Sequence, residues 1–281
     1  SASPANQLLR LHARGLSRMF HDPELPSPYD AIADLYDLEH AEHDDDIALI
    51  RNIVSVVGDP VIEFGCGSGR LLLPVARDGY AISGVDNSRA MLARAQTEVD
   101  KSGLSDQVSL VYGQMEETLP LSAESFGVGV FSLNGLMHLS SQERQVAALA
   151  EARRLLDPRG QLIIDLFNPT HEYLTHLGSH PHFEDARTTP DGTEVEKWTH
   201  RTVRSSTQQI DTRIWYDAVD TAGAVIRRRT AFTLRYIHAA ELTLMLQQAG
   251  FVEWQLYGTY DLDPFEDTSE RLIVLAERTP S

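Results

Sequence analysis

A glycine-rich turn follows a short apolar run early in the chain. Residues 61–70 read VIEFGCGSGR, with glycines at positions 65, 67 and 69. A turn of this kind exposes backbone N–H groups and admits a ligand where Cβ atoms would obstruct it, which indicates a site for a nucleotide-like cofactor. The dinucleotide-binding pattern G-x-G-x-x-G would place its third glycine at Arg70, so the spacing disfavours NAD.

Two carboxylates accompany this turn. Glu63 precedes it and suits a cofactor with a cationic amino-acid portion better than a pyrophosphate, because opposite charges attract. Asp86 ends the next apolar run, about 20 residues beyond Gly65, where a carboxylate can accept both hydroxyls of a ribose. Structural alternatives are that Glu63 ties down the loop by accepting backbone N–H bonds, and that Asp86 or Ser88 caps the following helix.

Short apolar runs alternate with helical periods through the middle of the chain, which is typical of a mostly parallel sheet covered on both faces. The expected strands span residues 61–64, 81–86, 108–112, 128–133 and 161–166. The expected helices span residues 44–57, 70–78, 88–102 and 141–156, after a helical pattern that begins at Tyr29. A turn at residues 157–160 ends the last helix. The sequence therefore predicts a doubly wound α/β fold.

The pattern changes beyond Pro169. Strand-like alternation over residues 194–203, 209–219 and 225–237 predicts an antiparallel insertion. A helix at 239–248 and strands at 251–257 and 271–276 then complete the first sheet. The expected division is an N-terminal arm over 1–28 with an amphipathic stretch at 7–19, an α/β domain over 29–169 and 238–281, and an inserted antiparallel β subdomain over 170–237.

The turn and its carboxylates together resemble the class I S-adenosylmethionine-dependent methyltransferases. Glu63-x-Gly65-x-Gly67-x-Gly69 is similar to the family's first motif and Asp86 to its second, and the similarity runs from about Tyr29 to Ala276. The resemblance implies S-adenosylmethionine as the cofactor, on a seven-stranded, mostly parallel sheet with an antiparallel last strand and an inserted antiparallel β lid. The cofactor contacts that it implies are Glu63, Gly65, Gly67, Gly69, Asp86, Asn87, Gln114, Met115 and Leu133.

Two departures from the family pattern are visible. Gly113-Gln114-Met115 stands where the family commonly has Gly-Asp-Met, and the amide of Gln114 can still accept from an adenine amino group. Phe126-Gly127 stands where the family often has Phe-Asp, an Asp that we interpret as structural. Residues 131–139 resemble the family's loop beside the methionine portion and the transferred methyl, which places His138 at the mouth of the pocket.

The C-terminal part of the chain indicates which branch of this family it resembles. Residues 235–238, 249–251 and 260–265 look like those of amino-sugar N-methyltransferases and of glycine or sarcosine N-methyltransferases. Those enzymes insert an antiparallel lid after the fifth strand, where the strands expected between 193 and 237 fall. The expected function is therefore methyl transfer to a small molecule, with N-methylation of an amine favoured.

Methyl transfer from a sulfonium is an in-line displacement, so such an enzyme has mainly to align a lone pair with the S–CH₃ axis and exclude water. His138, Tyr29 and Tyr36 are the catalytic candidates, because an imidazole or a phenol can orient an amine or accept its proton. The alternative is that they simply pack against apolar neighbours. O- or C-methylation, and a sensor that binds the cofactor or its demethylated product without turnover, are the competing functions.

Charge limits the partners. A net charge of −17 repels a phosphate backbone, so no nucleic acid is expected, and the arginines at 227–229 are interpreted as a solvated face. An acidic entrance near Glu39–Asp46 favours a cationic amine as the methyl acceptor. Self-association is left open, with the N-terminal arm and the inserted strands as contact surfaces.

Composition limits the disulfides, metal sites and cellular location that can be expected. Cys66 is the single cysteine, which excludes an intramolecular disulfide and a multi-cysteine zinc site. No metal is expected, because His40–Asp46 is interpreted as a charged helix start facing solvent and Asp165 and Asn168 alone do not make a magnesium site. No apolar run reaches the ~20 residues of a membrane span and no secretory signal is visible, so the cytoplasm is the expected location.

Overall fold

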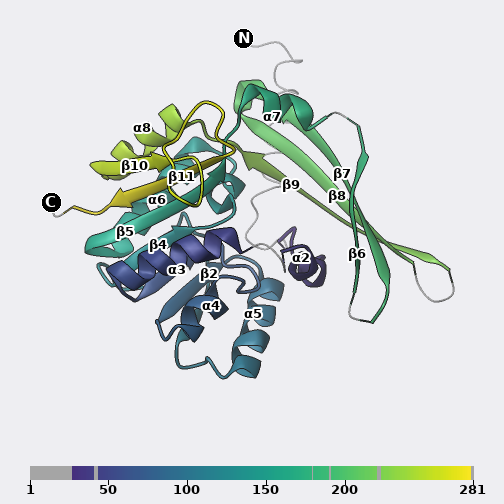
Figure 1. Ribbon diagram of the computed structural model, residues 1–281. Helices are drawn as coiled ribbons and strands as arrows, with labels where there is room; N and C mark the ends of the chain where they lie inside the picture. The colour runs from purple at the N-terminus through teal and green to yellow at the C-terminus, as the bar shows by residue number, and fades with distance from the viewer. Residues whose placement is uncertain (1–26, 41–43, 179, 190, 220–222, 280–281) are drawn as a thin grey trace, which may run out of the picture.

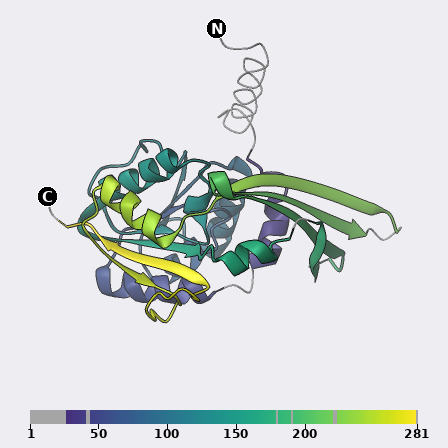
Figure 2. The same cartoon turned by 90° about the horizontal axis from the view of Figure 1, so that it is seen from above.

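Two sheets organise the chain (Figure 1). A computed structural model describes residues 27–40, 44–178, 180–189, 191–219 and 223–279. A seven-stranded sheet forms the body of the molecule, and a four-stranded sheet extends from it as an arm (Figures 1 and 2). Among the described residues, no helix is long and apolar enough to cross a membrane.

The seven-stranded sheet confirms the predicted doubly wound α/β fold. In sheet order its strands are β10 (Glu253–Tyr257), β11 (Arg271–Glu277), β5 (Leu156–Phe167), β4 (Phe126–Phe131), β1 (Val61–Phe64), β2 (Ile82–Asp86) and β3 (Val108–Tyr112). β11, the last strand of the chain, runs antiparallel to both of its neighbours, whereas the pairs from β5 through β3 are parallel. The carboxyl ends of β1, β2 and β4 therefore meet at one edge, where ligands bind in open α/β sheets.

Helices cover both faces of this sheet. The helices of the described residues are α2 (Ala33–His40), α3 (Asp45–Val57), α4 (Leu72–Arg77), α5 (Arg89–Ser102), η1 (Gly135–His138), α6 (Gln142–Leu155), α7 (His171–His176), η2 (Ser205–Thr207) and α8 (Ala239–Ala249). α3 and α4 share one apolar cluster with one face of the sheet, and α6 and α8 share another with the opposite face. Every residue of β1 and β4 is buried, which explains their continuous apolar runs.

The four-stranded sheet is antiparallel throughout. Its order is β6 (His182–Thr188), β7 (Glu194–Arg204), β8 (Gln209–Val219) and β9 (Val225–Arg235). Its inner face packs Ile214 and Tyr216 against Ile32 and Leu35, beside and within α2. Its outer face carries Trp198 and Trp215, whose rings stack with centroids 6.5 Å apart. The predicted antiparallel insertion is present, and its boundaries as a separate subdomain stay a prediction.

Two elements of this region were not predicted. β6 is an edge strand in which five of seven residues are exposed, so its sequence, HFEDART, shows no apolar alternation. α7 has only six residues, and none of them is buried. A strand or helix without a buried face leaves no periodic signal in a sequence. The amphipathic stretch at 7–19 lies outside the described residues.

Several predicted boundaries around the parallel strands are wrong. Residues 157–160 were expected to form a turn, but they bulge within β5, where they lie opposite the single residue Gly127 of β4. β4 begins at Phe126 rather than 128 and ends at Phe131, because Leu133 and Asn134 have positive φ values that an extended strand cannot continue. α4 begins two residues later than expected, at Leu72.

Gly127 also explains one departure from the family pattern. A Cβ built on Gly127 would lie 3.0 Å from the carbonyl oxygen of Gly58, closer than side chains normally approach backbone. An Asp at this position would need Gly58 to shift by a few tenths of an ångström, so the packing before β1 favours glycine here.

Candidate active site

The glycine turn after β1 wraps around the end of β2. The N–H groups of Gly65 and Cys66 both donate to the carbonyl oxygen of Val85, at 2.8 and 3.0 Å. Gly67 has a φ of +54°, and among the described residues a Cβ placed there would approach only the Tyr36 ring, at 3.9 Å. The turn therefore presents accessible backbone beneath Tyr36.

The Asp86 carboxylate joins this turn to the end of β2. One oxygen accepts from the N–H of Gly67 at 2.9 Å, and the other from the N–H of Ser88 at 2.7 Å. Ser88 itself caps α5, since its Oγ accepts from the N–H of Met91 at 3.0 Å. The capping role thus belongs to Ser88, and the Asp86 oxygens keep lone pairs for further donors.

Glu63 is a buried carboxylate with one unpaired oxygen. Its side chain is 2% exposed; Oε1 accepts from Ser132 Oγ at 2.7 Å, and Oε2 has no hydrogen-bond partner in the described structure. The hydrogen bond that Glu63 accepts comes from a side-chain hydroxyl, and not from the backbone N–H groups of the loop. Burial raises the pKa of Glu63 to about 7, against the opposing effects of Ser132 and Arg70. A cationic ligand group would relieve this unpaired oxygen.

The ends of β2 and β3 lie beside the turn. Asn87 Nδ2 donates to Gln114 Oε1 at 3.1 Å, so these two predicted cofactor contacts adjoin each other. Met115 packs at the edge of the larger apolar cluster, and its Cε lies 3.3 Å from the position of a Cβ on Gly65. A side chain at position 65 would therefore meet Met115 as well as strain the turn, where φ is +80°.

The loop after β4 is held by a buried carboxylate that the sequence did not single out as part of the site. Asp165, 2% exposed, accepts from the N–H of Leu133 at 3.3 Å and from Arg271 Nε at 2.9 Å. The Tyr260 hydroxyl also donates to it, at 3.2 Å. Asn134 accepts from the N–H of Phe167 through its Oδ1 at 2.7 Å. These bonds fix Leu133 in a left-handed conformation at the same edge as the turn.

All three predicted catalytic residues meet above the glycine turn. The Tyr29 hydroxyl lies 3.3 Å from His138 Nε2, and the Tyr29 and Tyr36 rings meet edge to face with centroids 5.5 Å apart. Phe232 of β9 completes the group, 5.5 Å from the Tyr29 ring and 5.4 Å from the His138 ring. Phe232 was missed because an apolar residue in an alternating strand gives no sign of which site it faces.

These groups are uncharged. Desolvation lowers the pKa of His138 to about 4, so its imidazole is neutral at physiological pH. Desolvation also raises the pKa of Tyr29 and of Tyr36, so both phenols keep their protons. An imidazole with so low a pKa is a weak proton acceptor but can still exchange hydrogen bonds with Tyr29 and with a ligand.

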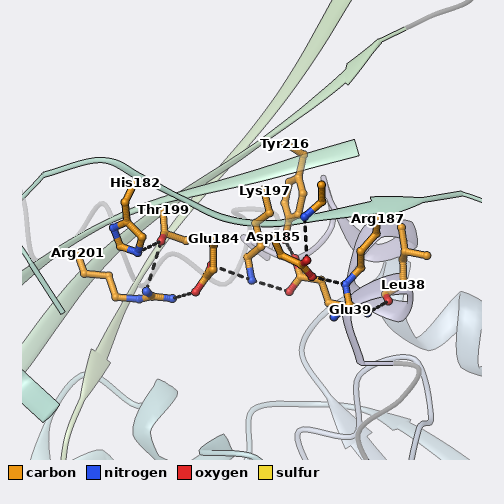
Figure 3. Close-up of polar contacts among 11 residues, drawn as sticks. Leu38, Glu39, His182, Glu184, Asp185, Arg187, Lys197, Thr199, Arg201 and Tyr216 are labelled. Carbon is orange, nitrogen blue, oxygen red and sulfur yellow. Dashed lines mark hydrogen bonds and ion pairs between the residues drawn. The ribbon is translucent and has the colours of Figure 1, made fainter. Parts of the chain in front are cut away.

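The structure contradicts the expected acidic entrance at the two ends of the run Glu39–Asp46. Glu39 accepts from Lys197 Nζ at 2.8 Å and from the Tyr216 hydroxyl (Figure 3). Asp46 does not face solvent: it is 1% exposed and paired with both terminal nitrogens of Arg70. These carboxylates are therefore neutralised within the fold and contribute little attraction for a cation.

The arginine run, the candidate metal ligands and Cys66 were also considered in the sequence. Arg227 pairs with Asp217 and Arg228 with Asp34, so the arginine run lies in partly exposed ion pairs. Among the described residues, no group of three or more His, Cys, Asp or Glu side chains could hold a metal ion. Cys66 is buried beside the turn, and burial raises the pKa of its thiol.

Comparison with known proteins identifies this arrangement. Residues 61–160 match the model of a family described as a methyltransferase domain. The cypemycin N-terminal methyltransferase of a Streptomyces species is 28% identical over 260 residues, which cover 90% of this chain and 98% of that protein. These matches support a methyltransferase enzyme, with its methyltransferase domain over residues 61–160.

Solved structures of methyltransferases share the fold of this chain. The CcbJ methyltransferase from Streptomyces caelestis superposes with a TM-score of 0.73 and 24% identity, over 92% of this chain and all of that one. The sugar N-methyltransferase KedS8 from Streptoalloteichus has a TM-score of 0.72 and 18% identity, over 93% and 96% of the two chains. At these identities the likeness concerns the fold.

The family resemblance implies S-adenosylmethionine as the cofactor. The residues present fit it: the turn offers open backbone at Gly67, and the unpaired Oε2 of Glu63 offers a negative partner for a cationic group. Asp86, which accepts from the N–H groups of Gly67 and Ser88, offers further acceptors for hydroxyl donors.

We expect S-adenosylhomocysteine binding to release protons near pH 7. With a pKa of about 7, Glu63 is roughly half protonated there, and a cationic group beside it lowers that pKa. Calorimetry in buffers of different ionisation enthalpy measures the release, which Glu63→Gln should abolish while weakening binding. Equal buffer dependence in both proteins would contradict this role.

His138 should make the folded state less stable in acid. Its pKa is about 4 when folded and about 6.5 when unfolded, so the unfolded chain binds the extra proton between these values. Stability is therefore lost as the pH falls from about 6.5 towards 4, by at most about 3 kcal/mol. Urea unfolding of the wild type and of His138→Asn across this range tests it; parallel stability curves would show that His138 does not titrate this way.

Proposed function

We propose that this methyltransferase methylates an amine nitrogen of a small molecule by direct in-line transfer. The observation that carries the proposal is the uncharged aromatic group above the glycine turn, in which Tyr29 and His138 form a hydrogen-bonded pair. An amine must attack unprotonated, and a site without a cation or a strong acid leaves its lone pair available. The names of the cypemycin N-terminal methyltransferase and the sugar N-methyltransferase KedS8 favour nitrogen as well.

The chain's residues have two tasks in this reaction. Tyr29 and His138 orient the amine through a hydrogen bond, so that its lone pair lies on the line of the breaking S–C bond. As the N–C bond forms, the nitrogen becomes cationic, and the faces of Tyr36 and Phe232 stabilise that charge. The neutral His138 is too weak a base to keep the proton, which leaves with the product or passes to water.

For the cofactor, we assign contacts as the family resemblance implies. Asp86 would accept from the ribose hydroxyls, and Glu63 would face the ammonium of the amino-acid portion. Asn87 and Gln114 would meet the adenine, with Met115 beside it, Leu133 near the methionine portion and the glycines at 65, 67 and 69 beneath. Sulfonium donors supply an activated methyl group and need no covalent protein intermediate.

O-methylation is the second candidate, and the site favours it less. A hydroxyl nucleophile has to lose its proton during transfer, which calls for a base of pKa near the working pH. His138 lies well below that range. Carbon methylation of an unactivated acceptor has the same requirement.

With S-adenosylmethionine saturating, so that Glu63 stays ionised beside the bound ammonium, we expect the acid limb of kcat/KM for the acceptor to follow the acceptor amine and not the enzyme. Activity should rise with pH up to the pKa of the amine, because only the neutral amine attacks and His138 does not titrate above about pH 4. A panel of amino sugars, amino acids and peptides with free N-termini, scored by mass spectrometry for N-methyl products, provides acceptors of different amine pKa.

Variants separate orientation from cofactor binding in the same assay. His138→Asn and Tyr29→Phe should lower kcat about 10- to 100-fold and leave S-adenosylhomocysteine affinity nearly unchanged. Methyl groups found on oxygen or carbon, or an acid limb fixed at one pH for amines of different pKa, would reject the amine proposal.

The outer face of the four-stranded sheet suits a second copy of the chain. Trp198 and Trp215 stack there, and Phe183, 49% exposed, meets Trp198 edge to face. In the register, Arg229 lies opposite Trp215 on β9, and Glu196 lies on the same face of β7.

We propose that the chain dimerises through this face. Strands of 11 residues in a sheet about four strands wide give roughly 600 Å² a copy, enough for a stable interface. Light scattering should give about twice the 31.3 kDa of one chain for the wild type and one chain's mass for Trp215→Asp. Leu244→Asp, at a 64% exposed site on α8, is the control and should stay dimeric. A monomeric wild type would disprove the dimer.

A further inference from the structure

The segment 27–40, which includes α2, lies between the two sheets and contacts both (Figure 1). It carries Tyr29 and Tyr36 of the site described above. α2 has only eight residues, too few to be a stable helix by itself, so its position depends on its neighbours. Those neighbours are therefore able to set where the two tyrosines lie.

The four-stranded sheet holds the C-terminal end of α2 through Glu39. Its two carboxylate oxygens are divided between the Tyr216 hydroxyl and Lys197 Nζ, the latter at 2.8 Å. Arg187 also donates to the Leu38 carbonyl oxygen, at 2.9 Å. Figure 3 shows these contacts converging on the end of α2.

Lys197 and Glu39 belong to a row of alternating charges on the inner face of the sheet. Lys197 lies 3.2 Å from Glu184, which Arg201 pairs with at 2.8 Å (Figure 3). The side chains of Glu39 and Lys197 are only 14% and 17% exposed, and Tyr216 is 3% exposed. Removing one member leaves a largely desolvated charge behind, so the row has one preferred arrangement.

The seven-stranded sheet holds the other side of the same segment. Ser88 Oγ donates to Asp30, and the N–H of Ser88 donates to Asp86. Arg94 of α5 donates to Asp37 through Nε at 2.7 Å. The Tyr36 ring lies 3.9 Å from the position of a Cβ on Gly67. Segment 27–40 thus joins the inner face of one sheet to the cofactor turn of the other.

We propose that Glu39, held by Lys197 and Tyr216, is a positioning residue that sets Tyr36 over the glycine turn and so couples the four-stranded sheet to cofactor binding. Glu39 acts through α2, with the ion pair as its anchor. This inference rests on the cofactor site and not on the amine acceptor. It can therefore fail while the proposed function stands, and the proposed function can fail while this inference stands.

The experiment measures S-adenosylhomocysteine affinity by calorimetry, and hydrogen exchange over residues 33–40 with and without that ligand. Lys197→Met and Glu39→Gln should each weaken binding about tenfold and remove the ligand-dependent protection of α2. The double variant should bind no more weakly than either single one, because both changes break the same pair. Lys197→Arg keeps the charge and should restore affinity.

Arg227→Met is the matched control. It removes an ion pair with Asp217 from the same four-stranded sheet, away from α2, and should change neither affinity nor protection. If Lys197→Met lowers the melting temperature but binds the ligand as tightly, with the same protection of α2, the pair is merely structural and the proposal is overturned. If Lys197→Met does not fold, Tyr216→Phe, which removes one hydroxyl, is judged by the same two readouts.

Discussion

The site depends on the carboxylate of Asp86, which binds the backbone of two turns at once. By accepting from Gly67 and Ser88, it fixes the glycine turn after β1 against the start of α5. Because β1 and β2 are parallel neighbours, their carboxyl ends already lie side by side, and these bonds set the turn within that edge. The open backbone at Gly67 and the ring of Tyr36 above it follow from this arrangement.

Loss of hydration shapes the chemistry around that edge. The same burial that keeps His138 neutral brings Glu63 close to half protonation near pH 7, because a desolvated group resists charge of either sign. The group around Tyr29 and His138 thus holds neutral hydrogen-bonding side chains, and the strand before the glycine turn holds a carboxylate with an unpaired oxygen. Glu39 and Asp46, at the two ends of the run that the sequence suggested as an attraction for amines, are instead engaged in ion pairs.

Much of the fold and of the glycine motif could be predicted from the sequence, for physical reasons. Buried parallel strands are continuous apolar runs, and the turn that follows β1 needs glycine, so the fold and the cofactor motif leave local signals. Tyr29 and His138 were candidates by residue type, and their 3.3 Å approach joins positions more than a hundred residues apart. No local pattern encodes such an approach.

The features that the sequence did not predict depend on contacts between elements. Phe232, Asp165 and the partners of Glu39 gain their roles from the way the sheets are placed, while β6 and α7 lack a buried face to give them a pattern. The turn expected at residues 157–160 has suitable residues, but β4 and β5 accommodate it as a bulge.

The alternation of side chains along β8 has a consequence for how this chain can diversify. Trp215 and Tyr216 are adjacent in sequence, yet one faces outward and the other lies beneath α2. A substitution and its immediate neighbour on that strand therefore fall under separate selective pressures. The outward surface of the sheet and the surface beneath α2 can drift independently while sharing a single backbone.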